Sequence, residues 1–105
     1  MSTLPLNLSL DTAREIAQAV AWIPGVAGLH PGRYGNAVYR TQGGMVEGLT
    51  VREPGAVLEV HIVYDVAARR TIDAVAAEVR ERVSSISNAK TTGISAIDVI
   101  FADAR

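Results

Sequence analysis

The chain has 105 residues, of which 49% are hydrophobic and 20% charged, and its formal net charge is −1 at pH 7. This length fits one domain whose apolar fraction can form a core, so disordered and collagen-like classes are excluded. The absence of cysteine excludes disulfides, thiolate nucleophiles, and iron–sulfur or cysteine-based zinc sites. Lys90 is the single lysine, which argues against a broad electrostatic surface for nucleic acid.

Leucines occupy alternate positions near the start of the chain: Leu4, Leu6, Leu8 and Leu10. A period of two is typical of an extended segment with one apolar face. Residues 1–10 are therefore expected to form an edge strand, which Pro5 tolerates, or an arm that pairs with a neighbouring subunit. The segment lacks the basic start and continuous apolar run of a signal peptide, so residues 11–105 are expected to form a single cytoplasmic domain.

A first helix is predicted from apolar residues at helical spacing: Ala13, Ile16, Ala17, Val20 and Ile23. Thr12 and Glu15 fit a capping box at its start, with Asp11 as an alternative cap, and Pro24-Gly25 ends it. Trp22 lies roughly opposite the apolar stripe. It either packs under a loop or the leucine-rich segment, or it is an exposed anchor for a partner.

The middle of the chain has the pattern of strands and turns. A short apolar run, Val26–Leu29, precedes a loop over residues 30–36 and an expected strand over residues 37–40. Residues 45–52 and 56–64 have the clearest hairpin pattern.

The register of this hairpin follows from its apolar positions. A two-residue loop, Pro54-Gly55 between paired Glu53 and Ala56, would place Leu49 opposite Val60 and Val51 opposite Leu58. The reverse, wetter face would then carry the polar residues Thr50, Arg52, Glu59 and His61.

A second helix is predicted from a further apolar stripe: Ile72, Val75, Ala76, Val79, Val83 and Ile86. Thr71 is expected to cap its start, Asp73 to favour its first turn, and Asn88 to provide a left-handed cap at its end. A last strand follows over residues 94–102. Its two faces are Ile97, Val99 and Phe101 on one side and Ala96, Asp98 and Ile100 on the other.

This order of elements predicts an α+β fold. It is a two-layer sandwich with two helices on one face of a small mixed sheet, in the order (β)αβββαβ. Because the last strand returns after a helix, it should lie parallel to a strand of the hairpin through a right-handed crossover.

Few residues point to chemistry. His30 and His61 lie in different segments without ligand spacing, so we expect no metal and no cofactor. Glu59 and His61 could serve a small ligand-binding or enzymatic domain, but Glu47 would point to the opposite face of the sheet. Arg69-Arg70 is read as a solvated pair, with an acidic partner as the alternative. Three serines at the end of the second helix lack a base: Ser84, Ser85 and Ser87.

A nucleic-acid-binding module is a further alternative. It rests on fold analogy alone, because the five aromatic residues are scattered and do not interleave with basic clusters.

Several segments together resemble the alkaline shock protein, or envelope stress response, family of Gram-positive bacteria. The segments, in order, are Leu8-Ser9-Leu10 before a helix with Ile16-Ala17, residues 23–29, residues 46–51, residues 57–64, residues 75–83, and Thr92-Gly93-Ile94 before Ile97-Asp98-Val99. The likeness covers residues 8–102.

This resemblance implies a non-enzymatic cytoplasmic stress-response protein. Such a protein would self-associate as a homo-oligomer and act as an adaptor or scaffold near the cell envelope through a membrane-anchored partner. The resemblance brings no catalytic residue, and we expect no nucleic acid among the partners. The candidate contact residues are Leu6, Leu8, Trp22, Arg33, Tyr34 and Ile100.

Overall fold

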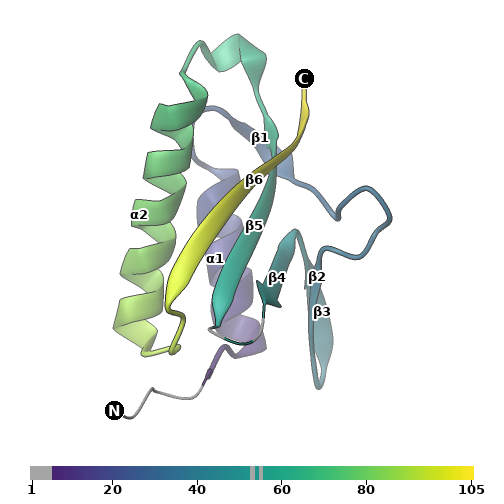
Figure 1. Cartoon of the computed structure of the whole chain (residues 1–105), viewed down its shortest axis with the longest axis vertical. Helices are drawn as coiled ribbons and strands as arrows, with labels where there is room; N and C mark the ends of the chain where they lie inside the picture. Colours follow the sequence, from purple (N-terminus) through teal and green to yellow (C-terminus); the bar gives the residue numbers. More distant parts are fainter. Residues whose placement is uncertain (1–5, 53, 55) are drawn as a thin grey trace.

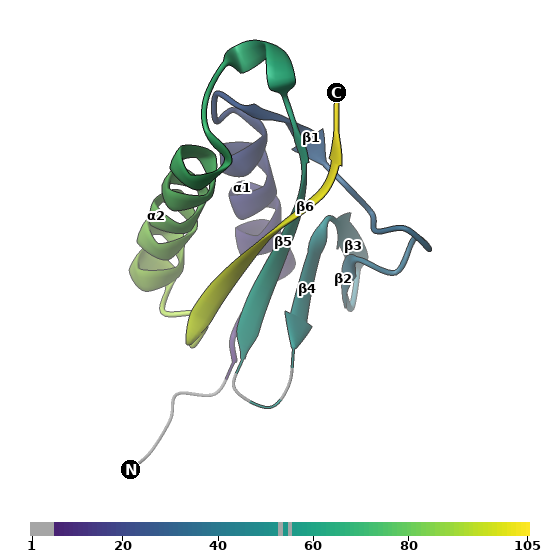
Figure 2. The ribbon, with the colours of Figure 1, turned by 45° about the horizontal axis from the view of Figure 1, so that its top comes forward.

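A computed structural model of the chain describes residues 6–52, 54 and 56–105. Two helices, α1 (Leu10–Ala21) and α2 (Ile72–Lys90), lie on one side of a sheet (Figures 1 and 2). The strands and a short 3-10 helix are β1 (Val26–Leu29), β2 (Val38–Thr41), β3 (Gly44–Glu47), β4 (Leu49–Arg52), β5 (Val57–Tyr64), η1 (Val66–Ala68) and β6 (Ala96–Ala104). The predicted α+β class, with two helices on one face of a mixed sheet, is confirmed.

Strand β5 is the centre of the sheet. β6 pairs with it in parallel along one edge, as expected for a strand that returns after α2. Two antiparallel strands share the other edge: β4 pairs with the first half of β5 and β1 with its end. His61 of β5 lies at the junction between these two strands. Its N–H donates to the Gly48 carbonyl at 2.8 Å, and its carbonyl accepts from the His30 N–H at 2.9 Å.

The predicted hairpin register is confirmed, since Leu49 lies opposite Val60 and Val51 opposite Leu58. Pairing ends at Arg52 and Val57, and Ala56 is a turn residue with φ of +50°. The expected pairing of Ala56 with Glu53 cannot be followed further, because Glu53 and Gly55 lie outside the described residues.

The single strand expected over residues 45–52 is divided at Gly48. This glycine has φ of +90°, and a Cβ there would lie 2.6 Å from the Leu29 Cβ. The chain changes direction at this point, so β3 pairs with β2 in a separate two-stranded sheet and only β4 joins β5. Together with β1, this division gives five strands among the described residues between the helices, where the sequence predicted three.

The start of α1 differs from the prediction. Ser9 is the N-cap, and its Oγ accepts from Thr12 N–H at 3.1 Å, so the expected caps at Thr12 and Asp11 are wrong. The helix begins earlier because Ser9 has extended backbone angles and can reach the free amide of the first turn. Thr12 is buried inside the helix instead.

The leucine-rich segment forms no strand over its described residues 6–9, and Leu10 is already helical. The expected edge strand is therefore wrong for these residues, and Leu4 and Pro5 lie outside the described part of the chain. Leu8 is only 5% exposed and belongs to the core. Its carbonyl accepts a hydrogen bond from the Tyr39 hydroxyl at 2.7 Å, which holds the segment in place.

Helix α2 begins as predicted, since Thr71 Oγ1 accepts from Ala74 N–H at 3.1 Å. The expected cap at Asn88 is wrong, because the helix continues to Lys90 and Thr91 has the left-handed conformation. The hydroxyls of Ser87 and Thr92 are hydrogen-bonded to each other, which joins the last turn to the residues that follow. Ile72, expected in the buried stripe, is 51% exposed.

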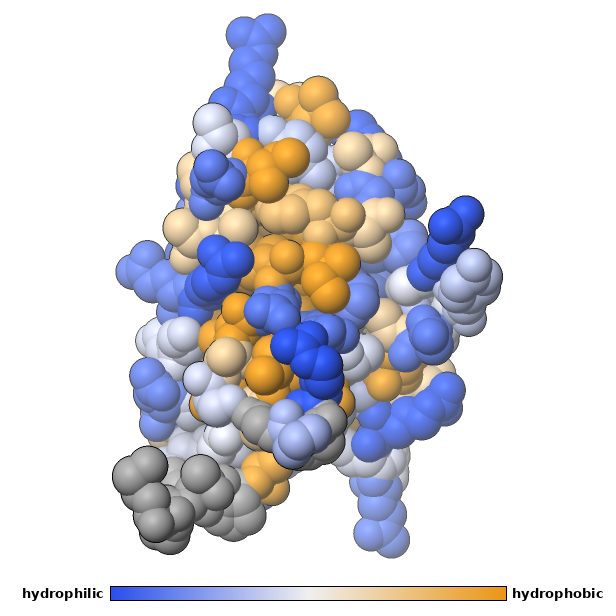
Figure 3. All heavy atoms as spheres, viewed as in Figure 1, coloured by the Kyte–Doolittle hydropathy of each residue, from blue (hydrophilic) through white to orange (hydrophobic). Residues whose placement is uncertain are grey.

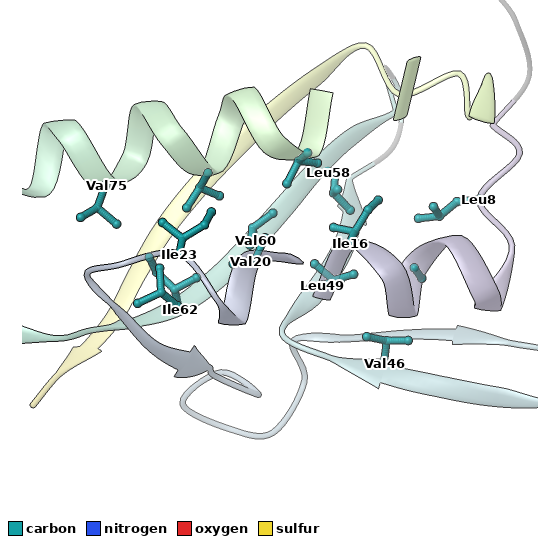
Figure 4. Close-up of a cluster of buried hydrophobic side chains, with 14 residues drawn as sticks. Leu8, Ile16, Val20, Ile23, Val46, Leu49, Leu58, Val60, Ile62 and Val75 are labelled. Atoms are coloured by element: carbon teal, nitrogen blue, oxygen red, sulfur yellow. The ribbon is translucent and has the colours of Figure 1, made fainter. Parts of the chain in front are cut away.

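The core lies between the helices and the sheet. Leu58, Val60 and Ile62 of β5 are fully buried there, against side chains of both helices (Figure 4). The buried helix residues of this layer include Ile16, Val20, Val75, Val79 and Val83. Ile97, Val99 and Phe101 of β6, which were predicted to share one face, pack against this cluster. Phe101 contacts Tyr64 edge to face, with ring centroids 6.0 Å apart.

Candidate functional site

The face of the sheet turned away from the helices carries the polar residues. Register places Thr50, Glu59 and Asp98 side by side across three strands, and His61 beside Ile100. Neither α1 nor α2 covers this face (Figure 2). In the view of Figure 3, apolar surface runs down the region of β5 and β6, with strongly hydrophilic atoms set into it.

The polar residues of this face form one network across β4, β5 and β6. Arg52 lies at its centre: Nη1 donates to Glu59 Oε2 at 2.6 Å, and Nη2 donates to Asp98 Oδ2 at 3.0 Å. Thr50 Oγ1 donates to the other Glu59 oxygen at 2.9 Å. The hydrogen bond to Asp98, followed by the contact with Glu59, raises the pKa of Arg52. The guanidinium therefore stays charged and both carboxylates are engaged.

His61 extends this network without completing an acid–base site. Its Nε2 is buried and has no hydrogen-bond partner among the described residues, and it lies 3.6 Å from Glu59 Oε1. Because Glu59 is already bound to Thr50 and Arg52, it is not a free base. His30 is held in its own loop, where Nδ1 accepts from Gly32 N–H at 3.0 Å. Within the described ranges, no three His, Asp or Glu side chains converge on a metal position.

A shallow cavity lies between the second half of α2 and the start of β6. Its volume is about 190 Å³, and its lining residues are Arg80, Ser84, Ser87, Asn88, Ile94, Ser95, Ala96 and Ile97. Ligand sites usually enclose about 300–1,000 Å³. The lining contains neither histidine nor carboxylate, and the Ser87 hydroxyl is bonded to Thr92. Two of the three predicted helix-end serines therefore lie here without a base.

The predicted contact residues do not form one site. Leu8 is in the core and Leu6 is partly buried against it. Trp22 is 85% exposed, so the alternative that it packs under a loop is wrong. Tyr34 is 84% exposed, with the Arg33 guanidinium 5.9 Å from its ring centroid.

Ile100 lies apart from these residues, half-buried in β6 on the uncovered face. Sequence reasoning placed Asp98 on that face with Ile100 but missed that Asp98 and Arg52 are ion-paired. The link depends on which strand lies beside β6, and the alternation within one strand does not contain that information.

The Arg69-Arg70 pair is only partly a solvated surface. Arg70 Nη1 donates to the Pro24 carbonyl at 2.7 Å and to Glu78 Oε1 at 2.8 Å. It therefore connects the loop after α1 to α2. Arg82, one turn further along α2, lies farther from Glu78, with its Nη2 3.8 Å from Glu78 Oε2.

No protein-family model, curated protein or solved structure matches this chain. Among the helices of the described residues, none has the length and apolar character needed to cross a bilayer.

Proposed function

We propose that this chain is a non-enzymatic assembly protein. It self-associates and acts as a cytoplasmic stress-response adaptor or scaffold, held near the cell envelope by a membrane-anchored partner. The resemblance of residues 8–102 to the envelope stress response family supports this proposal. Enzymatic function is disfavoured because catalysis requires an acid, base or nucleophile placed near a concave site, and Glu59 is engaged by Thr50 and Arg52.

One observation carries the proposal: Glu59 and Asp98 on the uncovered face are both bound by Arg52, while large aromatic side chains are exposed elsewhere. Trp22 and Tyr34 are each more than four-fifths exposed. Aromatic side chains supply much of the binding energy in protein interfaces, because they bury a large area with few rotatable bonds. Trp22, just beyond the last turn of α1, is our choice for the partner contact.

Crosslinking followed by pull-down from cells that natively make the protein tests the adaptor role. Wild-type chain is compared with Trp22→Ala and with Met45→Ala, a matched control at another exposed apolar residue. We expect wild type and Met45→Ala to capture the same membrane-anchored protein and Trp22→Ala to capture much less of it. Equal capture by all three variants, or no membrane protein above background, would contradict the proposal.

A second candidate function is small-ligand binding at Glu59 and His61. The observation that favours it is the buried His61 Nε2 without a hydrogen-bond partner among the described residues. Substitution His61→Ala, compared with wild type for ligand-induced shifts in melting temperature across a metabolite panel, tests this candidate. A shift that occurs in wild type and disappears in the variant would favour it over the adaptor role.

A further inference from the structure

We infer that the outer edge of β6 pairs with the same edge of a second copy, antiparallel, about a two-fold axis at Val99. This inference rests on the self-association in the proposed function and specifies where that contact lies. It begins from the difference between the two edges of the sheet. β1 and β4 cover the far edge of β5, whereas no strand of the described residues pairs with the outer side of β6.

The edge of β6 is unusually long. β6 has nine residues, whereas β1, β2, β3 and β4 have four each. Proteins usually protect long edges with lysine, proline or bulges, because unpaired backbone groups recruit other strands. β6 contains neither lysine nor proline, and its one bulge falls after Phe101, so residues 96–101 form a regular edge. A shallow cavity lies between α2 and the start of β6.

The symmetry of such a pair limits its register. Opposite residues in antiparallel strands point to the same face. A two-fold axis perpendicular to the sheet keeps the helices of both copies on one side, and the axis then passes through a residue. Within the regular run, only axes at Asp98 and Val99 pair five residues. An axis at Asp98 would oppose two aspartates, and like charges directly opposite destabilise a sheet.

An axis at Val99 has no such conflict. Val99 faces its own copy, Ile97 faces the partner's Phe101, and Asp98 faces the partner's Ile100. The first three residues already pack against the core cluster, so their pairing would extend the apolar layer beneath the helices from one copy into the next. In this register each Asp98 faces the partner's Ile100 and not a second carboxylate, and it keeps its ion pair with Arg52 of its own chain. The edge is therefore self-complementary, which favours a second copy over a foreign strand.

Single cysteine substitutions test this register cleanly because the natural chain has none. Val99→Cys should form a disulfide-linked dimer under mild oxidation, since directly opposite Cα atoms lie about 4.5–5.5 Å apart, within disulfide range. Ile97→Cys is the matched control. Its two copies would lie about 14 Å apart, at about 3.4 Å per residue, and should not be linked. The double variant Ile97→Cys with Phe101→Cys should be linked again.

Light scattering of the wild-type chain over a concentration range provides a measurement independent of any variant, and we expect a dimer that dissociates on dilution. A monomer at every concentration would overturn the inference. So would efficient linkage of Ile97→Cys alone, or linkage of Trp22→Cys in place of Val99→Cys. If Val99→Cys folds and forms the linked dimer but captures no membrane-anchored protein, the strand pairing is supported and the adaptor role is contradicted. If the chain captures that protein while it remains a monomer, the adaptor role is supported and the strand pairing is contradicted.

Discussion

Alternate residues of β5 lie in two different surroundings. On the side of the helices, Leu58, Val60 and Ile62 have no exposed surface. On the other side, Glu59 and His61 lie in a polar network that reaches β4 and β6. The backbone and hydrogen-bond pattern are shared, so the difference comes from what covers each face.

The two faces are therefore expected to contribute to different properties of the protein, namely stability and recognition. The covered face gains free energy because aliphatic surface leaves water, at about 25 cal/mol per Å². The uncovered face contains exposed ion pairs, which contribute little in water. We therefore expect substitutions on the first face to change folding and substitutions on the second to change contacts with other molecules.

Leu58→Ala should have the largest effect on stability. It removes a fully buried side chain between α1, α2 and the sheet, and such truncations cost about 2–5 kcal/mol. Urea unfolding measures the change. Glu59→Gln, at the next position on the opposite face, is the matched control and should shift the midpoint far less. Equal decreases in the free energy of unfolding for both variants would contradict the expected difference between the two faces.

Tyr39→Phe tests the hydrogen bond that links β2 to Leu8, just before α1. Loss of the bond to the Leu8 carbonyl should cost about 1–3 kcal/mol at pH 7, because a part-buried acceptor loses its partner. Burial raises the pKa of Tyr39 above 10.0, so the folded state favours the neutral phenol. That stabilisation is complete below pH 10 and is lost as the pH rises further.

The melting temperatures of wild type and Tyr39→Phe should therefore converge over the interval in which the pH rises above 10. The measurement at pH 7 serves as the reference. A gap that stays constant or widens across this interval would show that Tyr39 does not titrate as its burial requires.

Arg52→Gln should have the smallest effect on stability. The guanidinium is about half exposed, so solvent screens its pairs with Glu59 and Asp98. We expect a small decrease in the urea midpoint at low salt that disappears in high salt. Arg82→Gln, which affects a looser pair at 3.8 Å, is the control. A loss comparable to that of Leu58→Ala would mean that the uncovered face contributes to the core stability of the fold.

Patterns that extend over a complete element predicted the structure best. The alternation of residues 57–64 and the matching apolar positions of β4 were enough to predict their register. The stripe of α2 likewise identified most of its buried residues, and Thr71 identified its start. These predictions succeed because side-chain direction follows the period of a regular element.

The prediction failed where a regular pattern crossed an element boundary. The alternating leucines suggested a strand, yet Leu8 enters the core from an irregular segment while Leu10 begins α1. Residues 45–52 were predicted to form one strand because Gly48 does not interrupt their apolar pattern. The positive φ of Gly48 instead divides them, so that β3 pairs with β2 and β4 pairs with β5. The cap of α1 also moved, because the Ser9 hydroxyl accepts the hydrogen bond of the Thr12 N–H.

The sequence by itself determined the two amphipathic helices, the hairpin register and the parallel return of β6, because each depends on local period and on the order of elements. Only the tertiary structure decided that Arg52, Glu59 and Asp98 meet, that Trp22 is exposed and that no strand of the described residues pairs with the outer edge of β6. These features depend on which distant segments become neighbours. That choice is made by packing of the whole core, which the pattern within any one segment does not encode.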